Sequence, residues 1–324
     1  MTMIVLIALA AGCASALMFA SIISGAPISL VLFYLAPLPL MVAALGWGPL
    51  SATIGGISAA TVLGAIFGLP YCIAFVLTVA LPAWWLGHLA LLGRPIDNGV
   101  PSVNGAAPVA PAVEWYPIGR ILLWIAGFAT LTTMAALLTL GSDADAITGS
   151  LKRGLLRVLG PRNAAEPDVT EKWVDALIII APAAAAIVTV LTLTLNLWLA
   201  GRITATSGRL SRAWPDIKSA SLPPMTLVAL SVALAFCFTG GLLAMLAQIV
   251  SSALMLAYAL TGFAVLHTLT LALKARGLLL SATYAVVVMF GWPVLAMIVL
   301  GMADAIFGFR ARYLQGRPPP LPTS

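Results

Sequence analysis

The sequence has 324 residues, of which 62% are hydrophobic and 8% are charged, and its formal net charge is +6. A water-soluble globular chain carries roughly 25% charged residues. This deficit excludes a fully water-facing surface and indicates that lipid surrounds most of the chain. The basic residues lie in loops between apolar runs, which is typical of topology signals and of contacts with anionic lipid. We therefore expect the lipid bilayer as a partner and no nucleic acid.

The first part of the chain is uncharged, because no Asp, Glu, Lys or Arg precedes Arg94. This run has room for four crossings of about 20 residues each. Short turns rich in glycine, proline and serine separate the apolar segments, and such turns require antiparallel neighbours. We expect residues 1–92 to form a compact four-helix unit, with spans near 3–23, 27–46, 49–69 and 71–92.

The third of these spans carries two rows of small residues at four-residue spacing. Residues four apart lie on one face of a helix, and helices in lipid associate by close approach over small residues. The pattern predicts a central packing helix whose closest contact with a neighbour falls at Gly56. The first row is Gly48, Ala52, Gly56, Ala60, Gly64 and Gly68, the second is Ser51, Gly55 and Ala59, and the opposite face carries Leu50, Ile54, Ile57 and Leu63.

The first two spans have distinctive features of their own. A similar small-residue stripe runs along the first span, at Ala8, Gly12, Ala16 and Ala20. The second span contains Pro37 and Pro39, each of which removes a helical hydrogen bond and favours a kink. Irregular backbone at membrane depth is tolerated where protein or water satisfies it. Two interpretations stay open: the kinked helix frames a cavity, or the kink is purely structural.

The rest of the chain predicts further spans and few other structures. Residues 93–117 are rich in glycine, proline and alanine and read as a flexible linker, and residues 309–324 read as a disordered tail. The whole chain, 1–324, is predicted to be a single all-α transmembrane domain with eight or nine spans. Within 118–308 these spans lie near 118–140, 174–200, 224–240, 243–273 and 278–302.

One segment between spans is amphipathic rather than apolar. Residues 142–160 read as a short helix with Ser142 and Asp145 as a capping box. Such a helix lies on the membrane surface or caps the protein's own bundle. Its apolar positions are Ile147, Leu151, Leu155, Val158 and Leu159, and its basic ones are Lys152, Arg153 and Arg157.

Motifs that carry chemistry are missing from the sequence. It has no His-Glu-x-x-His pair for zinc, no Gly-x-Ser-x-Gly elbow and no phosphate-binding glycine loop. We therefore expect no enzymatic activity, no metal and no cofactor. The deep polar residues Asn196, Gln248 and His267 are weak candidates for binding a ligand. Hydrogen bonding between helices is the alternative role for such residues.

Several glycine and proline patterns resemble a known family. The runs Pro37-Leu38-Pro39, Gly46-Trp47-Gly48-Pro49 and Gly55-Gly56, with the ending Gly301-Met302-Ala303-Asp304 and Phe309-Arg310, are similar to the YybS-type family of uncharacterised bacterial membrane proteins. That family is distantly similar to the S components of energy-coupling-factor vitamin transporters. The resemblance implies a helical bundle in the bacterial cytoplasmic (inner) membrane that holds a small molecule. It also implies docking on a separate membrane subunit through small-residue helix faces.

These observations leave two functions open. The first is a non-enzymatic, transport-type membrane subunit that binds a small molecule or lipid among its helices. Such a subunit would need a partner for energy, because nothing in the sequence binds a nucleotide. The second is a structural or assembly protein that docks a partner subunit through small-residue helix faces.

The loop after the sixth span sets the expected orientation. It holds Arg202, Arg209, Arg212 and Lys218 against Asp216 alone. The positive-inside rule places such a loop, and with it the N terminus, in the cytoplasm. Nine spans would put the basic tail outside and eight would put it inside, and the sequence leaves both open.

This orientation predicts the accessibility of a cysteine placed at Ser207. A membrane-impermeant thiol reagent should label it only after the cells are opened, because the loop is cytoplasmic. Labelling of intact cells at this position would contradict the orientation.

Overall fold

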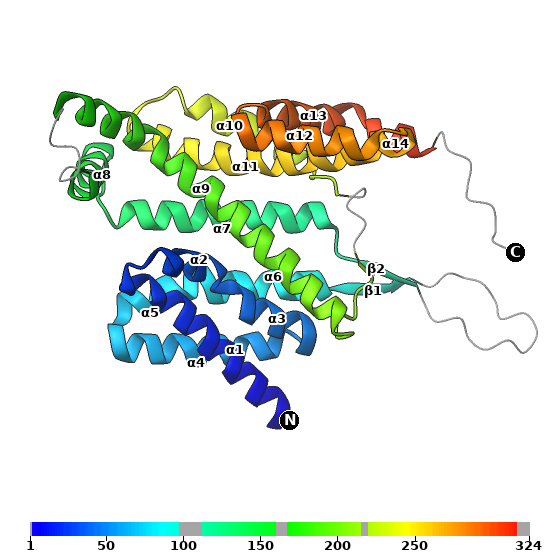
Figure 1. The fold of residues 1–324 in the computed structure, drawn as a ribbon, viewed down its shortest axis with the longest axis horizontal. Coiled ribbons are helices and arrows are strands. Elements are labelled where there is room, and N and C mark those ends of the chain that lie inside the picture. The colour runs from blue at the N-terminus through cyan, green and yellow to red at the C-terminus, as the bar shows by residue number, and fades with distance from the viewer. Residues whose placement is uncertain (1, 97–111, 160–166, 215–219, 316–324) are drawn as a thin grey trace, which may run out of the picture. The chain divides into compact units, whose positions relative to one another are not determined.

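A computed structural model describes residues 2–96, 112–159, 167–214 and 220–315, and nearly all of them are helical (Figure 1). In these ranges seven helices are long and apolar enough to cross a membrane, or eight if a helix pair bent by 64° near the C terminus counts as one span. The predicted all-α polytopic bundle is thereby confirmed. The chain is a multi-pass membrane protein.

The chain divides into two compact units. Unit 1 consists of Met1–Ile121 and Thr192–Pro215, and unit 2 consists of Leu122–Leu191 and Asp216–Ser324. The four-helix unit expected for residues 1–92 therefore makes up most of unit 1, and a segment from much later in the sequence completes it.

Four spans of unit 1 lie where the composition predicts them. The second and fourth are not continuous helices, since each contains a break or a π-helical turn. The elements are α1 (Thr2–Ala20), α2 (Pro27–Leu35), α3 (Pro37–Trp47), α4 (Pro49–Phe67), α5 (Leu69–Phe75), the π-helical segment η2 (Val76–Ala80) and α6 (Leu81–Leu91). The long helix α9 (Pro167–Thr206) reaches unit 1 with its C-terminal part.

The backbones of α1 and α4 touch over two glycines. A Cβ atom at Gly12 would collide with the carbonyl oxygen of Gly55, and one at Gly55 would collide with the carbonyl oxygen of Ala8. A Cβ at Gly56 would instead meet a side-chain atom, the Cβ of Ala80, at 3.2 Å. The prediction that Gly56 marks the closest approach is therefore wrong, because the second row of small residues faces α1.

The outer members of the first row have another role. Gly48 and Gly68 lie just outside α4, with φ angles of 93° and 92°, and they form the turns at its two ends. These angles favour glycine because it lacks a Cβ. Inside the helix Ala52 and Ala60 are buried, and a Cβ at Gly64 would lie 3.0 Å from that of Cys72. Leu63, expected on the opposite face, is buried as well.

The expected linker at 93–117 contains regular structure. Strand β1 (Gly93–Ile96) pairs antiparallel with β2 (Ala112–Trp115), with Arg94 opposite Glu114. The sequence prediction missed this ladder because strands of four residues leave little periodicity to detect. Residues 97–111 lie outside the described residues.

Unit 2 is organised around α11 (Gly241–Leu269), which packs most closely against α13 (Val294–Phe307). A Cβ at Gly262 would collide with the carbonyl oxygen of Met297, and one at Gly301 with that of Tyr258. Two glycines again bring two backbones together. The remaining helices are α7 (Ile118–Leu138), α8 (Ala144–Leu159), α10 (Met225–Phe236), α12 (Arg276–Phe290) and α14 (Phe309–Gln315).

Three predictions about this half need correction. The span expected at 224–240 is the 12-residue helix α10, which is shorter than a crossing requires. The span expected at 278–302 is divided into α12 and α13 by a turn around Gly291, whose φ is 71°. The tail expected to be disordered begins with the helix α14, and residues 316–324 lie outside the described residues.

The amphipathic segment forms helix α8, but its cap differs from the predicted one. The Asp143 carboxylate accepts a hydrogen bond from the Ala146 backbone N–H at 2.8 Å, so Asp143 is the N-cap residue. Ile147 is fully buried, and Lys152 forms an ion pair with Asp175 at 2.8 Å. Helix α8 also contacts α11, which agrees with the interpretation that it caps the bundle.

The glycine contacts predict an order of destabilisation for leucine substitutions. Gly55→Leu should lower the free energy of unfolding most, by about 1–3 kcal/mol, because the added atoms meet backbone that cannot move aside. Gly56→Leu should cost less, since it meets one alanine side chain. Gly127→Leu in α7 is the matched control, because a Cβ at Gly127 has nothing within 4 Å. Thermal unfolding of the variants in detergent measures this order of destabilisation. Equal melting temperatures for Gly55→Leu and Gly127→Leu would show that the contact between α1 and α4 at Gly55 has room for added atoms.

Candidate functional site

The second span of unit 1 breaks between α2 and α3, at the buried Ala36. Pro37 and Pro39 lack N–H groups, so the carbonyls of Phe33 and Leu35 lose their usual helical donors. The Ala36 N–H bonds to the Phe33 carbonyl at 3.2 Å, which is a tighter turn than the α-helix makes. The break therefore places backbone oxygens inside an apolar bundle, where they need donors.

Asn196 on α9 donates to a carbonyl beside this break, that of Tyr34. Its side chain is fully buried, and Nδ2 donates to the Tyr34 carbonyl and to the Thr192 carbonyl, both at 2.8 Å. The break at Ala36 lies near the middle of the 21-residue span Pro27–Trp47, which is about as long as a bilayer core is thick. The amide therefore ties α9 to the broken span near mid-membrane depth.

The Asn196 side chain also holds an acceptor that the described residues leave unused. Its Oδ1 is buried and has no hydrogen-bond partner among them, and the same is true of Oγ of Ser15 on α1. Leaving such a group unpaired in an apolar site costs free energy. Among its described residues, unit 1 therefore contains several unused hydrogen-bonding atoms on its membrane helices, which include Oη of Tyr71 on α5.

The fourth span adds a further irregularity at a similar position along its length. Its π-helical segment Val76–Ala80 contacts both α3 and α4, and Val79 is buried. Single π-helical turns inside membrane and soluble helices occur frequently at functional sites. We define the mid-membrane site as the α2–α3 break together with Asn196, which bonds to the Tyr34 carbonyl beside it. Ser15 and the π-helical segment lie on other helices of the same unit.

The other two residues proposed from the sequence are not part of this group. Gln248 and His267 both lie on α11 in unit 2, and their 19-residue separation corresponds to about 28 Å along the helix. The structure therefore does not bring them to one site. His267 Nε2 lies 2.9 Å from the Tyr284 hydroxyl, and Phe263 stacks on the Tyr284 ring at 5.0 Å. These contacts hold α12 on α11.

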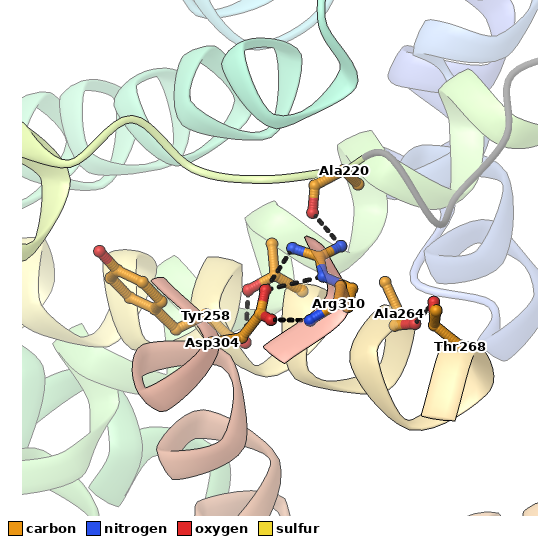
Figure 2. A network of polar contacts seen from close by, with 7 residues as sticks. Ala220, Tyr258, Ala264, Thr268, Asp304 and Arg310 are labelled. Atoms are coloured by element: carbon orange, nitrogen blue, oxygen red, sulfur yellow. Dashed lines mark hydrogen bonds and ion pairs between the residues drawn. The ribbon is translucent and has the colours of Figure 1, made fainter. Parts of the chain in front are cut away.

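Sequence reasoning missed a buried ion pair in unit 2, between Asp304 on α13 and Arg310 on α14 (Figure 2). Arg310 donates from Nε and Nη2 to Oδ2 of Asp304, both at 2.7 Å, and from its backbone N–H to Oδ1 at 2.9 Å. Its Nη1 donates to the Ala220 carbonyl at 2.7 Å. The pair fixes the 64° bend between α13 and α14. The sequence does contain a signal for this ion pair, because an acidic and a basic residue lie on either side of Gly308 at the end of an apolar helix.

Comparisons with protein-family models, with curated proteins and with solved structures give no match. The resemblance to the YybS-type family therefore stays a prediction. Within the described residues, no group of three or more His, Cys, Asp and Glu side chains is placed to hold a metal ion.

The buried and the exposed ion pairs of this chain predict very different substitution effects. Asp304→Ala should destabilise unit 2 by about 3–5 kcal/mol, because it leaves the Arg310 charge buried without its carboxylate. Glu114→Ala is the control, since it breaks the exposed Arg94–Glu114 pair and should cost about 1 kcal/mol or less. Thermal unfolding in detergent compares the two variants, and a similar small loss in both would show that the buried pair does not hold the bend.

Proposed function

We propose that the protein is a non-enzymatic, transport-type membrane subunit that binds a small molecule or lipid at the mid-membrane site of unit 1. The observation that carries this proposal is the buried Oδ1 of Asn196, which has no partner among the described residues and lies beside a broken span. Discontinuous membrane helices are the usual place for substrate sites in transporters. A ligand that donates a hydrogen bond to Oδ1 would remove the cost of the unpaired acceptor.

The composition of the spans limits the chemistry of this ligand. The four spans before Arg94 contain no Asp, Glu, Lys or Arg. Ion-coupled carriers usually place ionisable residues at membrane depth. The ligand is therefore neutral or amphipathic, and the energy for movement comes from a partner subunit. We place the protein in the bacterial cytoplasmic membrane, on the basis of the family resemblance.

One observation favours the second function, a structural or assembly protein. Helix α12 has no buried residue, so most of its apolar surface outside the Tyr284 contact with α11 is open to lipid or to another subunit. The small-residue stripes of α1 and α4, first considered for docking, are occupied within the protein. Gly12 and Gly55 join α1 to α4, and Cβ atoms at Gly56 and Gly64 would meet the side chains of Ala80 and Cys72. An assembly function would therefore use α12 instead of those glycines.

Native mass spectrometry of the protein purified in mild detergent tests the proposed binding site. Asn196→Leu removes the donor and the acceptor while keeping a similar size. A co-purified molecule present on the wild type should be reduced at least about tenfold in this variant, since one good hydrogen bond to a buried group is worth that much.

The control for this experiment is Thr189→Val, on the same helix. The Thr189 hydroxyl is exposed and, among the described residues, bonds only to the Ala185 carbonyl of its own helix, at 2.9 Å. Thr189→Val should retain the bound molecule at the wild-type level. Equal occupancy in all three proteins, or no bound molecule in any, would count against the site. Asn196→Leu should still fold, because an interhelical hydrogen bond in a membrane contributes only about 0.6–2 kcal/mol.

A further inference from the structure

The segment that follows α9 folds back onto the end of unit 1. The backbone N–H groups of Arg209 and Leu210 both donate to the Thr204 carbonyl, at 2.8 and 3.1 Å. Gly208, with a φ of 66°, makes the reversal possible. This turn closes the C terminus of α9 and carries residues 209–214 across the ends of the neighbouring spans.

Arg212 fixes this segment to two other parts of unit 1. Its Nη1 donates to the Ala90 carbonyl near the end of α6, and its Nη2 donates to the Tyr116 carbonyl, both at 3.1 Å. Its guanidinium also lies 5.8 Å from the centre of the Trp115 ring. Partial burial lowers the pKa of Arg212, yet an arginine stays protonated, and a cation suits the carbonyl end of a helix. The role of Arg212 is therefore structural.

Arg202 and Arg209 differ from Arg212 because their side chains are exposed. Each guanidinium lies over a tryptophan ring, Arg202 at 5.2 Å from Trp214 and Arg209 at 5.4 Å from Trp47. A guanidinium stacked on a ring keeps its N–H edge available for a second partner. In the described structure neither side chain donates to a carboxylate, and residues 202–214 contain no Asp or Glu.

We propose that Arg202 and Arg209 each bind the phosphate group of an anionic phospholipid headgroup. Tryptophan rings concentrate at the membrane–water interface, which is the depth of the lipid phosphates. Guanidinium groups bind phosphate through paired, charge-assisted hydrogen bonds. A free phosphate ion offers the same chemistry, but the stacking on Trp47 and Trp214 holds both cations at the ends of apolar spans, which favours the lipid. This site lies at the span ends and is separate from the mid-membrane site.

The experiment measures lipid retention by the whole protein in nanodiscs that contain phosphatidylcholine and phosphatidylglycerol. Native mass spectrometry counts the phosphatidylglycerol molecules that remain bound to the wild type and to three single variants, Arg202→Gln, Arg209→Gln and Arg94→Gln. Arg202→Gln and Arg209→Gln should each weaken retention about fivefold. Arg94→Gln is the matched control, since it removes one positive charge from the same unit, at a side chain already paired with Glu114.

Two further arms decide the nature of the ligand. Arg202→Lys keeps the charge but loses the forked guanidinium donor. A headgroup site predicts that this variant retains less lipid, whereas simple charge attraction predicts that it retains as much lipid as the wild type. Inorganic phosphate at millimolar concentration should leave the bound lipid in place. The proposal is overturned if Arg94→Gln weakens retention as much as the other two glutamine variants, if Arg202→Lys behaves as wild type, or if inorganic phosphate displaces the lipid.

Discussion

Direct contact between helix backbones, made possible by paired glycines, is the interaction on which both units depend. Gly12 and Gly55 bring α1 against α4, and Gly262 and Gly301 bring α11 against α13. In lipid the burial of apolar side chains gives helices little reason to associate, so dispersion between closely approaching backbones supplies much of the attraction. Both contacts hold carbonyl oxygens where even one methyl group would not fit, which makes the packing specific as well as close.

Polar side chains stabilise the less regular parts of the backbone. Asn196, Arg212 and Arg310 each donate to a backbone carbonyl on another element, at a helix break, at the end of a helix and in a loop, respectively. An unpaired carbonyl in apolar surroundings is costly. These three side chains come from late in the sequence, and each one holds a part of the backbone that could not satisfy itself.

Much of this fold could be predicted from composition, because the absence of charge before Arg94 and the spacing of turns locate four spans to within a few residues. The faces of those spans were harder to predict. Two adjacent rows of small residues run along α4, and periodicity alone cannot say which one meets backbone and which meets side chains. The short strand pair and the break at Gly291 depend on local turn geometry. The Asp304–Arg310 pair was missed because Arg310 was assigned to a disordered tail that begins at residue 309, whereas Asp304 lay in the segment before it.

The division of unit 1 into two stretches of sequence has a consequence for its synthesis. A ribosome adds about 5–20 residues per second, and Asn196 follows Tyr34 by 162 residues. The carbonyl of Tyr34 therefore enters the membrane roughly 8–32 s before its donor exists. During this interval the first four spans stay together through contacts among themselves, of which the contact of α1 with α4 is the most extensive. Unit 1 is therefore completed only after α9 has been synthesised, so its assembly depends on the rate of translation as well as on packing.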